Sequence, residues 1–288
     1  MTASCFTDAK NLKNKFFKQH LCFDGETPSF RKNEIVTKAS WQKGMAIKME
    51  MTYLDRNVAG IKEKMAQAAR DAGRDPAEIG LLAAVKSGEI EEIRYLHRAL
   101  GVNDLGENRV QQFLEHYEAL KEEAGIRWHF IGSLQTNKVK YIIDKVCMIH
   151  SLDSLRLAAE IEKQAAKRGI VMDVLVEINS GEEEAKGGVL PHETEDFCLA
   201  LSDFPHLRLR GFMTMAPKCE NLTQYREYFE ETSQLVLDIW RKKLHNIIES
   251  PVLSMGMSDS FPAAIASGST MVRVGRGLFV GRDAQRGK

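Results

Sequence analysis

Eight short apolar runs, separated by amphipathic windows, constrain the fold of this chain more than any other feature. The spacing of apolar residues three and four apart in the windows is typical of helices, and the short runs are typical of buried strands. The predicted strands are 80–85, 102–105, 127–131, 148–152, 173–179, 207–213, 252–255 and 271–274. The predicted helices are 54–72, 89–100, 108–124, 136–145, 153–168, 192–203, 221–246 and 259–267.

Eight strands that alternate with helices predict a single (β/α)8 TIM barrel. At 288 residues, 43% of them hydrophobic, the chain is long enough to bury the core of such a barrel. An open, doubly wound sheet is the structural alternative, because periodicity alone does not reveal closure. No GxGxxG motif follows the first predicted strand, which disfavours that alternative.

Residues 1–50 differ from the rest of the chain. Lysines crowd a stretch with little periodicity, and Gly25 and Pro28 follow among scattered polar residues. We therefore divide the chain into a poorly ordered extension, residues 1–50, and a barrel domain, residues 51–288. Because Met45, Met49 and Met51 precede the first convincing helix, the extension is alternatively a mis-assigned start of translation.

Composition narrows the class of partner and the compartment. Forty basic and forty acidic side chains cancel, so no global field attracts nucleic acid or an anionic membrane. The chain has no apolar stretch of the length that spans a membrane, about 18 residues, and its first part lacks the apolar region of a secretory signal. Five cysteines without metal-ligand spacing indicate reduced thiols. We expect a cytosolic protein with a small-molecule partner.

In a barrel, the residues just past each strand meet at one mouth, and here these residues are polar or glycine-rich. Lys86 follows the first strand, at the end of the apolar run 81–85. A lysine held in a desolvated pocket is partly neutral, and only a neutral amine attacks an aldehyde or ketone to form a Schiff base. The structural alternative is a lysine that simply reaches water from the end of a strand.

The loops after the last two strands favour a phosphate site. Ser254 and Ser258 offer hydroxyl groups, and Gly256, Gly275 and Gly277 allow the backbone to approach an anion. An aldehyde-capturing lysine and a phosphate cradle match the two ends of pyridoxal 5'-phosphate (PLP), and they equally match a Schiff-base aldolase acting on a sugar phosphate.

Arg273 bears on the choice between these ligands. Beside a pyridine nitrogen, a guanidinium would keep that nitrogen unprotonated and so weaken carbanion chemistry. Its alternative role is to bind a phosphate or carboxylate elsewhere in the mouth.

Other polar residues near the mouth have structural interpretations. We expect Glu107 and Asn108 to cap the helix that follows them. His129 lies in an apolar strand and is interpreted as a core histidine, with no acid placed to complete a triad and no second histidine at ligand spacing. Lys186 has acidic neighbours and is expected to be charged and solvated. We assign no metal site and no catalytic residue.

Several segments resemble a known family. They are 128–138, which reads WHFIGSLQTNK, and the shorter segments 106–108, 253–259 and 268–275. From about residue 54 to 283 the chain resembles the pyridoxal phosphate homeostasis proteins, which are single-barrel relatives of the N-terminal domain of alanine racemase. The resemblance implies an alanine racemase-like barrel without the C-terminal β domain, and PLP as cofactor. It implies a cofactor site formed by Lys86, Asn108, Ser254, Met257, Arg273, Gly275 and Arg276.

The resemblance also implies roles for these residues. Lys86 would form the aldimine and Arg273 would face the pyridine nitrogen, while Ser254 and the backbone around Gly275 and Arg276 would hold the phosphate. The implied function is the binding, storage or delivery of PLP without established catalysis, with PLP-dependent apoenzymes as candidate recipients. A racemase of this type needs a tyrosine from a second domain, for which we expect no room after Arg282.

The chain departs from the family around the lysine. The family's Val-Ser-Lys-Thr-Lys-Pro reads Ala84-Val85-Lys86-Ser87-Gly88-Glu89 here, so the second lysine and the proline are absent. In the loop after the fifth strand, Gly181 and Ala185 replace serines, whereas Lys186 matches the family and is a candidate secondary cofactor site. The competing functions are a PLP-dependent amino-acid racemase and a Schiff-base aldolase. A closed barrel has no free sheet edge, so we expect a monomer.

Overall fold

Eight parallel strands close into the barrel that the alternation predicts. The computed structural model describes residues 51–183, 187–242 and 250–282. Its strands are β1 (Gly80–Ala84), β2 (Asp104–Glu107), β3 (Arg127–Phe130), β4 (Met148–Leu152), β5 (Met172–Ile178), β6 (Leu207–Thr214), β7 (Val252–Ser254) and β8 (Met271–Val274). Each strand pairs with the next in the chain, and β8 pairs with β1 through the register of Leu82 with Arg273. The prediction of a closed barrel is therefore confirmed, and the open sheet is excluded.

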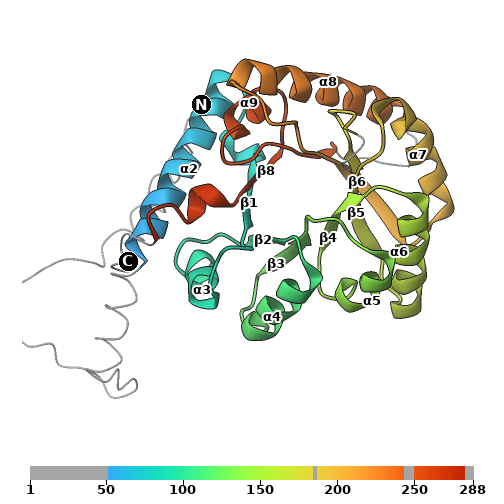
Figure 1. Cartoon of the computed structure of the whole chain (residues 1–288), viewed down its shortest axis with the longest axis horizontal. Coiled ribbons are helices and arrows are strands. Elements are labelled where there is room, and N and C mark those ends of the chain that lie inside the picture. The colour runs from blue at the N-terminus through green and yellow to red at the C-terminus, as the bar shows by residue number, and fades with distance from the viewer. Residues whose placement is uncertain (1–50, 184–186, 243–249, 283–288) are drawn as a thin grey trace, which may run out of the picture. The chain divides into compact units, whose positions relative to one another are not determined.

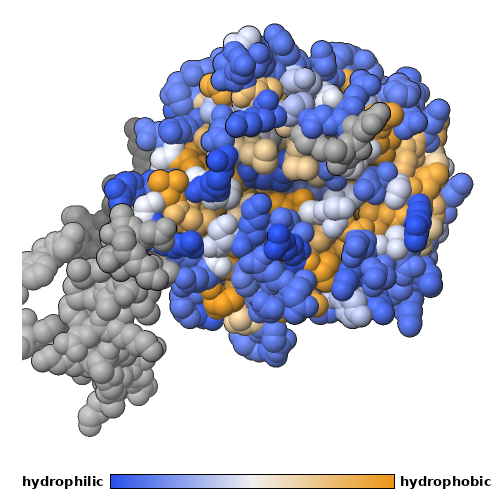
Figure 2. Space-filling view, viewed as in Figure 1, coloured by the Kyte–Doolittle hydropathy of each residue, from blue (hydrophilic) through white to orange (hydrophobic). Residues whose placement is uncertain are grey.

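Helices connect the strands and surround the barrel (Figure 1). They are α2 (Thr52–Asp71), α3 (Ile90–Arg98), α4 (Val110–Leu120), α5 (Val139–Ile142), α6 (Leu155–Arg168), α7 (Thr194–Ala200), α8 (Leu222–Arg241) and α9 (Phe261–Ala266). Five short 3-10 turns, η1 to η5, join them: Pro76–Glu78, Thr136–Lys138, Pro191–Glu193, Leu201–Asp203 and Arg276–Leu278. On the face in Figure 2, hydrophilic residues cover most helices, and hydrophobic residues show mainly between them.

Local sequence explains why these helices begin and end where they do. Helix α2 buries Leu54, Val58, Ile61 and Met65, which recur every three or four residues and so form one face. Helix α6 begins after Ser154, whose hydroxyl accepts a hydrogen bond from the backbone N–H of Leu157. It ends at Gly169, where the backbone is left-handed with φ 64°.

Two predicted helices are interrupted. The window 136–145 contains the turn η2 and the four-residue helix α5. The window 192–203 is helix α7 between two 3-10 turns. The predicted helix 221–246 is observed as α8, and its last residues lie outside the described part of the chain.

The apolar core lies mainly between the strands and the helices. A separate, smaller cluster of Met148, Leu175 and Met213 lies apart from it, on strands β4, β5 and β6. Buried polar side chains on the strands include His129, His150, Ser254 and Arg273. The inner layer is thus partly polar, which prepares the site described below.

The extension predicted for residues 1–50 lies outside the described residues, so its state stays a prediction. The described barrel residues belong to one unit, which spans residues 45–288. Among the helices that are described, none is both long enough and apolar enough to cross a membrane.

Candidate functional site

Lys86 lies in a turn directly after β1, and its side chain is exposed. The backbone N–H of Gly88 donates to the carbonyl of Val85 at 2.7 Å, which closes the turn. The Gln112 side chain donates to the Lys86 carbonyl at 2.7 Å, and Arg282 donates to the Ser87 carbonyl at 2.6 Å. Three bonds therefore hold the backbone of the turn, and the Lys86 side chain is exposed and not desolvated.

Gly88 stands where the family has its second lysine, and the structure gives a packing reason for the glycine. A Cβ atom at Gly88 would lie 2.9 Å from the Phe279 ring and 3.1 Å from Cγ1 of Ile93. Contacts this close require a neighbour to move. A lysine at position 88 would have to displace the Phe279 ring. In this chain the space beside Gly88 is therefore filled by Phe279, and the second lysine of the family is absent.

Arg273 is buried on β8, next to β1, and points to the carboxyl ends of the strands. One of its terminal nitrogens, Nη1, donates to the Ser254 carbonyl at 2.6 Å and to the Ser254 hydroxyl at 2.9 Å. The other, Nη2, donates to the Thr214 carbonyl at 2.9 Å. Burial lowers the pKa of Arg273 to about 10, against an opposing effect of the Glu177 charge, so the guanidinium stays charged at neutral pH.

The loops after β7 and β8 are joined to each other. The Ser258 hydroxyl accepts a hydrogen bond from the backbone N–H of Gly277 at 3.1 Å. Gly275 packs against the end of β1, since a Cβ there would lie 3.3 Å from Cβ of Ala84. Arg276 pairs with Asp259 across the two loops, and Met257 is 43% exposed beside them. The predicted residues of both loops therefore lie next to the strand that precedes Lys86.

Asn108 follows β2 at the same end of the barrel. Its Oδ1 atom is buried and has no hydrogen-bond partner within the described part of the chain. Gly132 fixes the position of Asn108, because a Cβ at Gly132 would lie 2.2 Å from the Asn108 carbonyl oxygen. An unpaired amide oxygen at the mouth is available to accept a bond from a ligand.

The expectation that Glu107 and Asn108 cap a helix is wrong. The first residue before α4 is Arg109, and no side chain caps it. Strand β2 continues to Glu107, which is therefore completely buried and bonds His116 on α4 at 2.7 Å. The Glu107 carboxylate therefore links strand β2 to helix α4. In the sequence, the same short polar motif is compatible with this role and with helix capping.

His129 is a buried histidine with both ring nitrogens bonded, as expected for a core residue. The expectation that no acid is placed to pair with it is wrong, and a second histidine, distant in sequence, bonds it as well. Nε2 of His129 lies 3.0 Å from Oδ1 of Asp104, and Nδ1 lies 3.0 Å from Nε2 of His150. Asp104 and His150 belong to the neighbouring strands β2 and β4, so only the register of the barrel brings them together.

Glu177 is a further residue that sequence reasoning did not find. It lies buried on β5. Burial, followed by repulsion from Asp153, raises its pKa to about 7, although the charge of Arg273 acts in the opposite direction. A carboxyl group with such a pKa can hold or release a proton near neutrality.

Two predictions are not tested by this arrangement. Lys186 lies outside the described residues, so its role as a secondary cofactor site stays a prediction. Among the residues that are described, no three His, Cys, Asp or Glu side chains are grouped so that they could hold a metal ion.

Comparison with known proteins identifies the family. A family model described as the N-terminal domain of alanine racemase matches residues 57–283. The pyridoxal phosphate homeostasis protein of Aquifex aeolicus is 45% identical over 219 residues, which are 76% of this chain and 94% of the relative. The protein of the same name from Escherichia coli K12 is 36% identical, over 81% of this chain and 98% of the relative.

Solved structures agree with the sequence relatives. PipY of Synechococcus elongatus, solved with PLP bound, superposes with a TM-score of 0.66 at 27% identity, over 76% of this chain and 99% of PipY. An alanine racemase of Clostridium difficile shares the fold with a TM-score of 0.58 at 18% identity, over 78% of this chain but only 56% of the racemase. From the family model and the relatives that it spans almost completely, the chain belongs to the pyridoxal phosphate homeostasis protein family, which is built on the barrel of the alanine racemase N-terminal domain.

Proposed function

We propose that this protein binds PLP at the barrel mouth and takes part in intracellular PLP homeostasis by storing or delivering the cofactor. When bound, PLP supplies an aldehyde that forms a Schiff base with a lysine amine. In this proposal the amine belongs to Lys86, which stands exposed on a backbone turn held by three hydrogen bonds. Arg273 faces the pyridine nitrogen.

Arg273 is the observation that carries the proposal. A buried guanidinium beside the strand that leads to Lys86 needs hydrogen-bond acceptors, and the three bonds to Ser254 and Thr214 use only three of its five N–H groups. The remaining N–H groups suit a neutral pyridine nitrogen, which is an acceptor. The buried, unpaired Oδ1 of Asn108 adds an acceptor for a ligand donor. The residues present therefore fit the cofactor.

The phosphate site is proposed in the loops after β7 and β8. The backbone N–H groups of Ser258 and Arg276 have no hydrogen-bond partner within the described residues, whereas that of Gly277 is used by Ser258. Gly275 and Met257 border the same loops. The Ser254 hydroxyl already has two partners, His150 and Arg273. We therefore propose that backbone N–H groups contribute more to phosphate binding than Ser254 does.

A carrier is favoured over an enzyme because of the environment proposed for the ring. A guanidinium does not protonate the pyridine nitrogen, so the ring withdraws electrons less strongly than in enzymes with an acid at that position. The relatives that the chain spans almost completely are named homeostasis proteins. Further parts of the proposal are delivery to PLP-dependent apoenzymes in the cytosol, a monomeric state, and Lys186 as a secondary site.

Absorption and borohydride reduction test the proposal. We expect purified protein with added PLP to show a violet absorption band, and reduction to fix the cofactor on Lys86, as located by peptide mass spectrometry. Lys86→Ala should lose the band, while Lys163→Ala, which removes an exposed lysine of α6, should keep it. An unchanged reduced adduct in Lys86→Ala would show that another residue holds the cofactor.

Proton exchange separates the carrier from a racemase. The loaded protein would be incubated with L-alanine in deuterated water, and α-proton exchange followed by NMR. We expect exchange no faster than with free PLP at the same concentration. Exchange at rates typical of enzymes, about 1 per second or more, would favour the racemase instead. A carbonyl adduct on Lys86 that forms with a sugar phosphate but not with PLP would favour the aldolase.

A further inference from the structure

A continuous chain of hydrogen bonds crosses the inside of the barrel. It runs from Asp104 to His129 at 3.0 Å, from His129 to His150 at 3.0 Å, and from His150 to the Ser254 hydroxyl at 3.2 Å. Arg273 completes it with a bond to the same hydroxyl at 2.9 Å. Because β4 is not a neighbour of β7, the bond between His150 and Ser254 bridges the barrel interior and not two paired strands.

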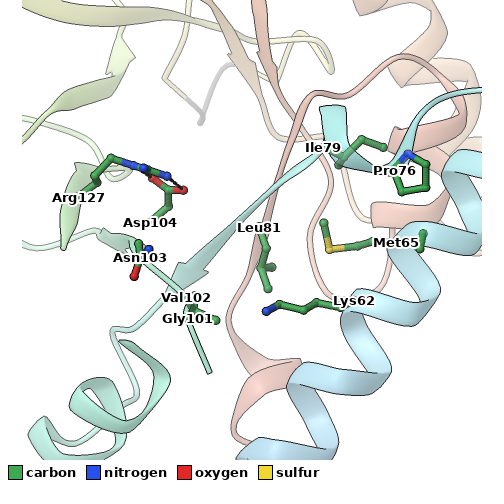
Figure 3. A pocket seen from close by; sticks show the side chains of 11 residues that line it. Lys62, Met65, Pro76, Ile79, Leu81, Gly101, Val102, Asn103, Asp104 and Arg127 are labelled. Atoms are coloured by element: carbon green, nitrogen blue, oxygen red, sulfur yellow. Dashed lines mark hydrogen bonds and ion pairs between the residues drawn. The ribbon is translucent and has the colours of Figure 1, made fainter. Parts of the chain in front are cut away.

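The outer end of the chain is open to solvent at the amino ends of the strands. Asp104 pairs there with Arg127, whose side chain is 59% exposed, and both line a cavity of about 310 Å³ beside α2 (Figure 3). Figure 3 shows the two side chains pointing at one another at the edge of this cavity. The inner end is Arg273, at the opposite, carboxyl end of the barrel. The chain therefore links the two ends of the molecule through a buried interior.

The chemistry of its two ends fits a chain in which every hydrogen bond is donated from the Arg273 side toward Asp104. Arg273 can only donate hydrogen bonds. Burial alone would raise the pKa of Asp104, but the bonds from His129 and Arg127 lower it to about 2, so the carboxylate is ionised and can only accept. Burial, followed by repulsion from His129 and Arg273, holds the pKa of His150 well below its usual range, so this ring is neutral.

The direction determines the tautomers of both histidines. In that direction Nε2 of His129 donates to Asp104, and Nδ1 of His129 accepts from His150. His150 therefore carries its proton on Nε2, and its Nδ1 accepts from the Ser254 hydroxyl. The hydroxyl donates in this bond and accepts from Arg273. Cys147 lies 3.4 Å from Nε2 of His129, but burial raises the pKa of this thiol to about 12, so it does not act as a competing anion.

We propose that His129 and His150 are positioning residues of the cofactor site, which hold the Ser254 hydroxyl as an acceptor for Arg273 and thereby aim the free N–H groups of Arg273 at the pyridine nitrogen. The role rests on the proposed binding of PLP. The alternative is that these hydrogen-bonded side chains only stabilise the barrel and do not orient Arg273. In that case the orientation of Arg273 would not depend on the histidine tautomers.

The first test uses the protein without cofactor. Two-bond 1H–15N correlation spectra of histidine-labelled protein report the tautomer of each ring, with assignment from His129→Gln and His150→Gln. We expect the proton shared between His129 and His150 on Nε2 of His150, and the proton shared with Asp104 on Nε2 of His129. Asp104→Asn keeps the shape of the side chain but can donate from its amide, so the opposite tautomer should appear in it. A proton on Nδ1 of His150 in the unaltered protein would overturn the proposal.

The second test uses the protein loaded with PLP. His150→Phe and Asp104→Asn should shift the violet absorption band and weaken PLP binding about tenfold, because Arg273 loses its fixed orientation. The control is His116→Phe, which removes another buried histidine, one that bonds Glu107 and is not part of the hydrogen-bond chain. Circular dichroism melting shows whether each variant is folded. If His150→Phe does not fold, Asp104→Asn still tests the proposal.

The outcomes separate the two proposals. If the unaltered protein forms no Lys86-dependent band, the proposed function fails, and the tautomer spectra still decide whether the directed chain exists. If the band forms but is the same in folded Asp104→Asn and His150→Phe as in the unaltered protein, PLP binding stands and the positioning role fails.

Discussion

Glu177 shows how a single buried residue makes the stability of the protein depend on pH. Its pKa is raised to about 7 by burial and by repulsion from Asp153, whereas a glutamate in the unfolded chain titrates near its ordinary value of 4.5. Between these pH values the folded protein binds more protons than the unfolded chain, so its free energy of unfolding falls as the pH rises from about 4.5 to 7. The full effect of this group is about 3 kcal/mol.

Glu177→Gln should remove that contribution, because the amide stays neutral. Urea unfolding at pH 5 and pH 8 measures most of it: the decrease in the free energy of unfolding between the two pH values should be smaller in the variant by about 2.5 kcal/mol. Glu78→Gln is the control, since Glu78 is exposed at the end of η1. Equal decreases in Glu177→Gln and in the unaltered protein would contradict the raised pKa.

At the scale of elements, the loops after β2 and β3 depend on a close approach of two backbones. A Cβ atom at Gly132 would lie 2.2 Å from the Asn108 carbonyl oxygen and 2.7 Å from its Cα. Gly132→Ala should therefore lower the free energy of unfolding by about 1–3 kcal/mol and displace Asn108. Gly60→Ala is a matched control, because Gly60 lies in α2 with nothing within 4 Å of the added atom, and alanine there should stabilise by about 0.5–1 kcal/mol. If urea unfolding gave the same free energy of unfolding for Gly132→Ala as for the unaltered protein, this account would be contradicted.

The elements themselves were largely predictable, and the contacts between their side chains were not. Apolar runs located all eight strands, although the second was predicted at 102–105 and is observed at Asp104–Glu107, where Asp104 and Glu107 make the strand partly polar. The recurrence of apolar residues every three or four positions located the long helices α2, α6 and α8. It overestimated the helix at 136–145, where only Val139–Ile142 is α-helical. It could not find the bonds from His129 to Asp104 and His150, because these depend on strand register, which no single sequence window contains.

At the scale of the whole molecule, closure of the sheet brings the carboxyl ends of all eight described strands to one mouth. Lys86, Asn108 and Arg273 are distant in sequence, yet they follow or belong to strands β1, β2 and β8, which are neighbours only because β8 pairs with β1. The resemblance to a family predicted these residues from motifs, and the structure shows that their strands are adjacent in the closed barrel. The monomeric state stays a prediction that rests on the absence of a sheet edge.

Because the proposed ligand contacts residues from several strands, its binding should stabilise the barrel as one unit. A ligand that binds only the folded state at 100 times its dissociation constant raises the free energy of unfolding by about 2.7 kcal/mol. For a barrel of this size, that corresponds to a rise in melting temperature of about 5–10 °C. Calorimetry with and without PLP should show this rise in the unaltered protein and in Lys163→Ala. Lys86→Ala should lose most of it, since only noncovalent contacts to Arg273 and the phosphate loops would remain. A full rise in Lys86→Ala would mean that PLP stabilises the barrel from a site that does not include Lys86.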